Sequence, residues 1–294
     1  MTFLKESIYR KSCSLFARDR LSLDVSMPKI SQLLDSQAPE LLALCSRQVG
    51  KTTSAAARVT HHAIFHSDTL SLIVSATQRQ AGILQHRVIT FLRKLNRSET
   101  WQEVPGQSAY VPEYIGRNAK LVRCSTLSLE LANGSQVISA PASPDTIRGY
   151  SPHVIIIDEA AYTPDAVYQA VRPMRMRTKA QILAMSSAGA TQGWYWQAWT
   201  EADSGWAKIE VLSSECPWIA QSELDRERRS LPAKIYEREY CNRFLEPGAA
   251  ALSPELIKDL FDTDVESMDD QMSAADRTRA YAERGPQFSV EGET

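Results

Sequence analysis

Short, mostly apolar runs recur along the chain at intervals that leave room for helices. Such a run predicts a strand buried on both faces, because alternation would be expected if one face met solvent. These runs lie at residues 41–45, 70–75, 154–157, 182–185 and 209–212. Apolar residues at helical spacing follow the first two runs, over 51–65 and 81–95. Strands that alternate with helices predict an α/β fold with a mainly parallel sheet flanked by helices.

Turn residues predict where this alternation is interrupted. Asn133-Gly134 separates two short alternating runs, 127–131 and 136–138. Both turn residues tolerate positive φ, so the pattern predicts an inserted β-hairpin. Proline and glycine are frequent over 98–119, which predicts a loop there.

The two ends of the chain differ from its middle. Helical patterns near 218–230 and 233–243 predict a small helical subdomain after the last strand, and one further short helix is predicted near 253–261. Acidic residues among Ser, Met and Gln then predict a flexible tail. We therefore expect an N-terminal lead-in at 1–30, one α/β domain at 31–250, and a short helix with an acidic tail at 251–294.

Composition narrows the class of protein without identifying it. Of 294 residues, 43% are hydrophobic and 23% are charged, which is ordinary for a globular protein and excludes a largely disordered chain. The net charge of -2 argues against coating of nucleic acid by bulk positive charge, although a local basic patch stays open. Scattered cysteines without a C-x-x-C pair predict reduced thiols in a cytosolic protein. No apolar run approaches the length that predicts a membrane span.

The first candidate for chemistry lies between the strand 41–45 and the helix that follows it. Glycine, lysine and threonine where a strand leads into a helix predict a loop that binds phosphate through backbone N–H groups. Lys51 would neutralise β- and γ-phosphate oxygens, Thr52 would ligate Mg²⁺, and Gly50 would let the backbone approach. Cys45 stands where such loops usually have their first glycine, so the motif alone is weak. The candidate nucleotide contacts are Ser46, Arg47, Gln48, Val49, Gly50, Lys51, Thr52 and Thr53.

A pair of acids ends the most strand-like run of the chain. Asp158 and Glu159 follow 154–157, at the carboxyl end of a strand, where doubly wound sheets bind ligands. Asp158 would hold Mg²⁺ through water, and Glu159 would orient or deprotonate an attacking water. Together with the phosphate loop, these acids predict a site where Mg²⁺ and a phosphate chain bind and water attacks a phosphate. For the pair alone, a helix N-cap is the alternative.

Small residues follow the strand at 182–185. Hydroxyl side chains at the end of a strand can sense a γ-phosphate and pass its loss to a neighbouring element. Ser186, Ser187 and Ala188 are therefore candidate coupling residues, although such a run by itself more often marks a plain strand-to-loop turn.

At these residues the chain resembles the ATPase domain of the large terminase subunit of tailed phages, the DNA-packaging motor. The phosphate loop of that family reads Ser-Arg-Gln-x-Gly-Lys-Ser/Thr without the first glycine, as Ser46–Thr52 does here. Its second motif reads Asp-Glu-Ala with Arg-Gly upstream, as Asp158–Ala160 and Arg148-Gly149 do here. Its coupling motif leads to an aromatic segment, here 193–199. The resemblance covers about residues 20–250 and implies a P-loop NTPase fold of the RecA- and helicase-like kind.

The resemblance also implies cofactors, partners and further site residues. The cofactors would be ATP and Mg²⁺. The partners would be double-stranded DNA, a homo-oligomeric ring of this chain, the terminase small subunit and the portal protein, in the host cytoplasm and without a membrane. Gln32 matches a glutamine that recognises adenine, Arg47 could touch the γ-phosphate, and Arg148 matches an arginine proposed to reach a neighbouring subunit's nucleotide. A surface glutamine and a surface ion pair are the alternatives for Gln32 and Arg148.

The chain departs from that family near its end. Full-length subunits continue into a nuclease of the ribonuclease-H type, whereas a short segment without a strand ending in an acid follows Pro247 here. We therefore expect no nuclease activity, and acids such as Asp262 and Asp270 favour a solvated tail over a metal cluster. Two other functions stay open: a DEAD-like helicase, which would need a second motor domain, and a scaffold that no longer turns over nucleotide.

Three further groups of residues have structural alternatives. One is a set of histidines at helical spacing that could bind a metal but lacks another kind of ligand nearby: His61, His62 and His66. Another is a basic cluster that could bind DNA phosphates or a neighbouring subunit, or form a solvated face: Arg172, Arg175, Arg177 and Lys179. For the tryptophans at 194, 196 and 199, core packing is favoured over base stacking.

Overall fold

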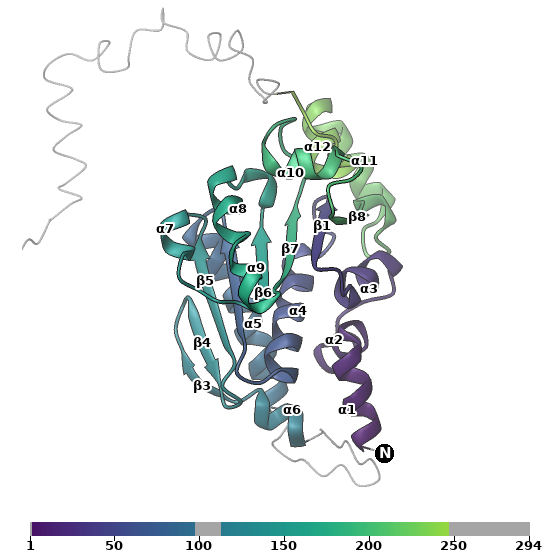
Figure 1. Ribbon diagram of the computed structural model, residues 1–294. Helices are drawn as coiled ribbons and strands as arrows, with labels where there is room; N and C mark the ends of the chain where they lie inside the picture. The colour runs from purple at the N-terminus through teal and green to yellow at the C-terminus, as the bar shows by residue number, and fades with distance from the viewer. Residues whose placement is uncertain (1, 98–112, 247–294) are drawn as a thin grey trace, which may run out of the picture. The chain divides into compact units, whose positions relative to one another are not determined.

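The computed structural model describes residues 2–97 and 113–246, which form a sheet with helices on both faces (Figure 1). The eight strands of this sheet lie in the order β3-β4-β5-β2-β6-β7-β1-β8. They are β1 Glu40–Cys45, β2 Leu70–Ser75, β3 Leu121–Cys124, β4 Ser128–Leu131, β5 Gln136–Pro141, β6 Val154–Asp158, β7 Gln181–Ser186 and β8 Ala207–Val211. From β5 to β8 all neighbours are parallel, whereas β4 pairs antiparallel with both β3 and β5.

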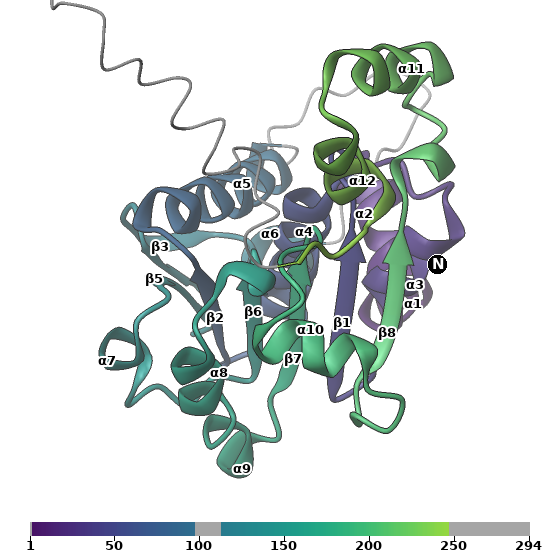
Figure 2. The same cartoon turned by 90° about the horizontal axis from the view of Figure 1, so that it is seen from above.

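Helices cover the two faces of this sheet, as the view along the strands shows (Figure 2). One face carries α1 Thr2–Lys11, α2 Cys13–Leu21, α3 Pro28–Asp35, α4 Lys51–Phe65, α5 Gln78–Arg97 and α6 Glu113–Asn118. The other carries α7 Pro144–Ile147, α8 Asp165–Val171, α9 Met174–Thr178 and α10 Gly193–Thr200. The last helices, α11 Gln221–Ser230 and α12 Ala233–Cys241, lie beyond the carboxyl ends of β1 and β8 (Figure 1).

Alternate residues of each central strand enter different hydrophobic cores. In β1, Leu41 and Ala43 face the core under α2–α5, whereas Leu42 and Leu44 face the core under α7–α10. Because both faces of the parallel strands are covered, every position favours an apolar residue. This explains the continuous apolar runs of the sequence, and the predicted α/β fold with a mainly parallel sheet is confirmed.

The N-terminal helices share the first of these cores. Phe16 of α2 meets Phe65 of α4 edge to face, with 5.5 Å between the ring centroids. Arg58 of α4 donates to the carbonyl oxygen of Leu33 at 2.8 Å, which satisfies a carbonyl near the end of α3. From Tyr9 to Ile30, the segment expected as a lead-in at 1–30 therefore contributes to the main core.

One local prediction is wrong in part, and another is correct but incomplete. The predicted loop at 98–119 ends in the helix α6, because Ile115 is buried against the core and Asn118 Nδ2 donates to the carbonyl oxygen of Ile64 at 2.9 Å. These tertiary contacts stabilise a helix too short to form by itself. The Asn133-Gly134 hairpin forms as predicted, but β5 also pairs with β2, so the hairpin extends the main sheet. The helix predicted near 253–261 and the acidic tail lie outside the described residues.

Candidate active site

The loop between β1 and α4 has the backbone conformation of an anion-binding turn. Gln48 and Gly50 both have left-handed φ, at 61° and 92°. Gly50 is favoured there because residues with a Cβ are strained at positive φ, although a Cβ would meet no neighbour within 4 Å. Such turns direct successive N–H groups to one point, and α4 begins there with its positive dipole end. The loop can therefore bind a phosphate.

Lys51 and the two acids meet at this edge of the sheet. Strand β7 lies between β1 and β6, so the end of β6 is two strands from the loop. Lys51 Nζ donates to the carbonyl oxygen of Cys45 at 3.2 Å and lies 3.9 Å from Glu159 Oε1. Burial raises the pKa of the Cys45 thiol to about 12, so Cys45 is a neutral core residue of the loop. The structure thus brings together the residues that the two motifs predicted.

Asp158 has the properties expected of a cation ligand. Burial, followed by the charge of Glu159, raises the pKa of Asp158 to about 6, and Lys51 opposes this shift. Its buried Oδ1 has no hydrogen-bond partner among the described residues. A buried carboxylate oxygen without a partner is costly unless a ligand satisfies it. Thr52 is in the first turn of α4 and partly buried, so the pair fits the site expected for Mg²⁺.

The structure provides few other ligands for a metal. In residues 2–97 and 113–246 no group of three or more His, Cys, Asp and Glu side chains could hold one.

Glu159 is held by the strand that separates the two motifs. Its backbone is left-handed, with φ 53°, a strained conformation for a residue other than glycine. Its Oε2 accepts a hydrogen bond from Ser186 Oγ at 3.3 Å, from the end of β7. The other two predicted coupling residues contact Tyr162. Ser187 hydrogen-bonds to the Tyr162 hydroxyl, and that hydroxyl donates to the carbonyl oxygen of Ala188 at 3.2 Å. Only Ser186 of the three contacts the acid.

Arg47 is bound by an acid that the sequence did not indicate. Arg47 Nε lies 2.7 Å from Glu239 Oε2, and its backbone N–H donates to the Glu239 carbonyl at 2.8 Å. Arg238 Nε donates to the other carboxylate oxygen at 2.9 Å. Burial acts to raise the pKa of Glu239, but the hydrogen bond and charge of Arg47, with the charge of Arg238, outweigh it and lower that pKa. Arg47, the predicted γ-phosphate contact, thus forms an ion pair with a residue of α12.

Ser46 faces away from the phosphate-binding turn. Its hydroxyl lies 2.8 Å from Ser213 Oγ and accepts from the Ser213 N–H at 2.5 Å. Its backbone N–H donates to the carbonyl oxygen of Val211. Asn242 Nδ2 also donates to that carbonyl, at 3.2 Å. Ser46 therefore anchors the loop to β8 and the segment after it, and no motif in the sequence indicated Ser213 or Asn242.

A small cavity of about 180 Å³ opens beside Gly50 and Thr53. Its walls are mostly apolar and include Val25, Ile30, Leu34, Val49 and Trp218. Trp218 is fixed by its Nε1, which donates to the carbonyl oxygen of Gln48 at 3.2 Å.

Gln32 does not line this cavity. It lies on the exposed side of α3, whereas Ile30 and Leu34 of the same helix face the cavity. The structure therefore lends the predicted adenine contact of Gln32 no support.

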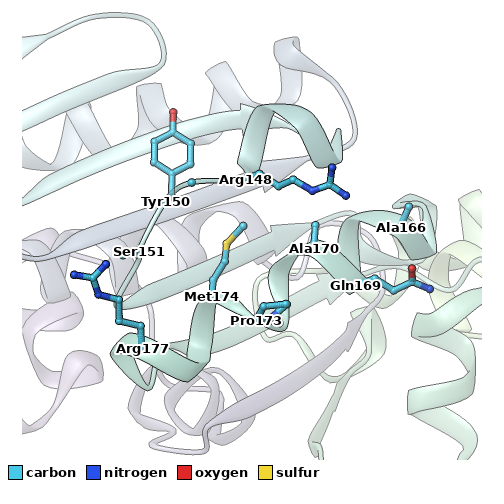
Figure 3. Close-up of a pocket in the computed structure, with 10 residues that line it drawn as sticks. Arg148, Tyr150, Ser151, Ala166, Gln169, Ala170, Pro173, Met174 and Arg177 are labelled. Carbon is cyan, nitrogen blue, oxygen red and sulfur yellow. The ribbon is translucent and has the colours of Figure 1, made fainter.

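Arg148 lies far from the phosphate loop of its own chain. It follows α7, which follows β5, and β5 is four strand spacings from β1, or about 19 Å. Its side chain is 68% exposed, 3.4 Å from Asp145. It lines one end of a cavity of about 600 Å³, with Arg177 at the other end and Met174 between them (Figure 3).

The remaining candidate groups are mostly structural. In the basic cluster, Arg175 pairs with Glu40, and Arg172 lies 5.8 Å from the ring centroid of Tyr168. Trp194 is buried and stacks on Tyr168, in agreement with a packing role.

Two of the histidines of α4 are largely buried and neutral. Burial lowers the pKa of His61 to about 4 and that of His62 to about 3. The ring of His62 stacks on that of His66 at 4.4 Å.

In the part of the chain that the structure describes, no helix has the length and apolar character needed to cross a membrane.

Comparisons with known proteins agree with this site. The sequence family described as terminase large subunit, T4likevirus-type, N-terminal, matches residues 42–239. The ATPase domain of the Thermus phage P74-26 large terminase superposes with a TM-score of 0.61 at 17% identity, over 76% of this chain and 94% of that one. At such identities the likeness shows the fold.

Two longer terminases have the same fold. The large terminase of bacteriophage D6E, in complex with ATP-γ-S, matches with a TM-score of 0.56 at 12% identity, over 74% of this chain and 53% of that one. The HK97 large terminase matches with a TM-score of 0.56 at 14% identity, over 76% and 50%. The chain thus spans about half the length of these two proteins. None of these matches favours a helicase.

The family match covers more than half of the chain, from β1 to α12, and includes the phosphate loop, the acids and the coupling residues. This chain therefore belongs to the terminase large subunit family of DNA-packaging ATPases, T4likevirus-type, and corresponds to its N-terminal part.

Proposed function

We propose that this chain binds Mg²⁺·ATP at the carboxyl edge of its sheet, hydrolyses it, and uses the cycle to move double-stranded DNA into a phage procapsid. The observation that supports this most strongly is the meeting of Lys51, Asp158 and Glu159 at one phosphate loop. In this proposal the loop backbone and Lys51 hold the β- and γ-phosphates. Thr52 and Asp158 hold Mg²⁺, which neutralises charge that develops on the phosphates.

Glu159 is the catalytic carboxylate in this proposal. It orients the attacking water or takes its proton, and the hydrogen bond from Ser186 holds it in place. Ser186, at the end of β7, would report the state of Glu159 to the rest of the strand. The coupling role of Ser187 and Ala188 would then run through Tyr162.

Two arginines would stabilise charge on the transferred phosphoryl group. Arg47 lies in the loop itself, where its Nε is held by Glu239. Arg148 is too distant from its own loop and would act on a neighbouring subunit, which requires a ring with head-to-tail interfaces. Besides DNA, the partners would be the small terminase subunit and the portal protein, in the host cytoplasm.

The adenine base of ATP would enter the apolar cavity beside Gly50. The cavity adjoins the phosphate loop, and Trp218 forms one wall of it. In this arrangement aromatic and aliphatic contacts would hold the base, and Gln32 would have no part in it.

The substitution Glu159→Gln tests this function. It keeps the shape of the side chain but removes the base, so turnover should fall by about 10²- to 10⁴-fold while a fluorescent ATP analogue still binds. Glu201→Gln, at an exposed position after α10, is the control and should leave turnover unchanged. Wild-type turnover in the Glu159→Gln variant would refute the assignment.

A further inference from the structure

Helix α5 carries an unusual concentration of positive charge. Its 20 residues include Arg79, Arg87, Arg93, Lys94 and Arg97 and no Asp or Glu. The chain as a whole has slightly more acids than bases, so this helix differs from the average surface of the molecule. The helix lies on the outside of its layer, beside the end of the sheet formed by β3–β5 (Figure 2).

The cationic residues share one face of the helix. At 100° per residue, the exposed positions Arg79, Ile83, Arg87, Thr90 and Arg93 fall within an arc of about 120°. The opposite face is buried on the sheet through residues such as Leu84, Val88 and Leu92. From Arg79 to Arg93 the exposed face runs about 21 Å along the helix axis. We call this face, with its three arginines, the α5 stripe.

In residues 2–97 and 113–246, no carboxylate pairs with an arginine of the α5 stripe. Among the described residues, none of its three arginines forms an ion pair or a hydrogen bond, whereas Arg47 and Arg175 are paired with acids. Lys94 falls within the same arc, but it donates to the carbonyl oxygen of Leu21 at 2.8 Å and is not counted in the stripe. The stripe thus presents three guanidinium groups without a partner in the described part of the chain, spaced along one exposed face of the helix.

Guanidinium groups spaced along one helix face fit the repeating phosphates of a nucleic-acid backbone. Guanidinium binds phosphate through two parallel hydrogen bonds, and 21 Å corresponds to about six base pairs of duplex. The stripe has no exposed Phe, Tyr or Trp side chain that would stack on unpaired bases, since Phe91 is buried. We propose that the α5 stripe binds the backbone of duplex DNA, an inference that rests on the proposed packaging function.

The start of α5 adjoins the candidate active site. Ser75, the last residue of β2, is in register with Asp158 on β6. Three residues later the helix begins, and Thr77 Oγ1 accepts from the Gln80 N–H at 3.2 Å as its cap. The helix that we propose to bind DNA therefore follows directly after β2, the strand that lies beside Asp158.

The test is the triple variant Arg79→Ala, Arg87→Ala and Arg93→Ala, with binding to a fluorescent 30-base-pair duplex measured over a series of salt concentrations. Alanine preserves the helix. The expected loss is at least tenfold in affinity at low salt. The slope of log K against log salt should fall by about 0.9 for each lost phosphate contact.

A charge-matched control is the triple variant Arg226→Ala, Arg228→Ala and Arg229→Ala. These arginines are exposed on α11, where Asp225 and Glu227 lie beside them, and their removal should leave binding and slope close to wild type. Equal losses in both variants, or an unchanged slope in the α5 variant, would overturn the proposal. So would a wild-type chain without salt-dependent DNA binding.

Two further readouts separate this proposal from its alternatives. ATP turnover without DNA should stay within about twofold of wild type in the α5 variant, because the stripe touches no nucleotide-binding residue. Failure of the Glu159→Gln test would refute the ATPase assignment while leaving the DNA measurement interpretable. If sedimentation showed that the α5 variant changes the oligomeric state and not DNA binding, the stripe would be a protein interface and the proposal would be wrong.

Discussion

Arg47 in the phosphate loop and Glu239 in α12 form an ion pair, with 2.7 Å between Nε and Oε2. The same two residues are also joined by a backbone hydrogen bond of 2.8 Å. A residue at the end of the described chain thus fixes the loop that begins the candidate active site. The phosphate loop and α12 are therefore joined by two contacts between the same two residues.

The Arg47–Glu239 pair should make stability depend on pH. The pKa of Glu239 lies below the ordinary value of 4.5, so the stabilisation is present above that value and is lost as the pH falls through the lower folded-state pKa. Glu239→Gln should reduce the free energy of unfolding by about 1 kcal/mol at pH 7, because Arg47 is largely exposed. Below pH 4.5 the difference should shrink.

Denaturant unfolding at pH 7 and at lower pH checks this expectation. Glu237→Gln, on the exposed side of the same helix, serves as the control. A loss that is equal at both pH values would mean that packing, and not the ion pair, is responsible.

Asp158 should have the opposite pH dependence. Its folded-state pKa of about 6 exceeds the ordinary value of 3.8, so the stabilisation is complete at low pH and is lost as the pH rises through 6. Asp158→Asn removes the buried charge and should raise the free energy of unfolding at pH 8 by up to about 3 kcal/mol, with little effect near pH 4. The same variant should lose Mg²⁺-dependent hydrolysis.

Thermal unfolding with and without Mg²⁺ gives a second check on Asp158. Mg²⁺ with ADP should stabilise the wild-type protein at pH 8 more than ADP alone, and this increment should vanish in Asp158→Asn. An increment that survives the substitution would remove Asp158 from the metal site.

Ser186 should affect turnover without affecting binding. Its hydroxyl donates to Glu159 at 3.3 Å, and hydrogen bonds to charged groups contribute about 1.5–3 kcal/mol. Ser186→Ala should therefore lower kcat by about tenfold and leave KM for ATP nearly unchanged. Ser230→Ala, at an exposed position of α11, is the control. Similar kinetics in the two variants would argue against a positioning role for Ser186.

Arg148 should act between subunits. Arg148→Ala and Glu159→Gln should each be nearly inactive alone. In a mixture, some interfaces pair an intact Arg148 from one chain with an intact Glu159 from its neighbour, so turnover should exceed that of either variant. Steady-state ATPase assays over a range of mixing ratios measure this. Full activity of Arg148→Ala alone, or no gain on mixing, would exclude the role.

Much of the architecture could be predicted because it depends on local patterns. The apolar runs at β1, β2, β6 and β7 are continuous since both faces of each strand are buried. The phosphate loop and the acids could be identified because their chemistry needs particular residues directly after a strand. Their joint presence in an α/β pattern already predicted one shared pocket.

Other features depended on contacts between distant parts of the chain. Nothing local in the sequence places β7 between β1 and β6, yet this order brings Ser186 to Glu159. The same holds for Glu239, which reads as one more acid on a charged helix until α12 folds over the loop. Hydrophobic periodicity reports which side of an element is buried, whereas the partner of each element is chosen by packing over the whole fold. The sequence alone therefore determined the central strands and the candidate site residues, and the tertiary structure decided which side chains hold those residues in place.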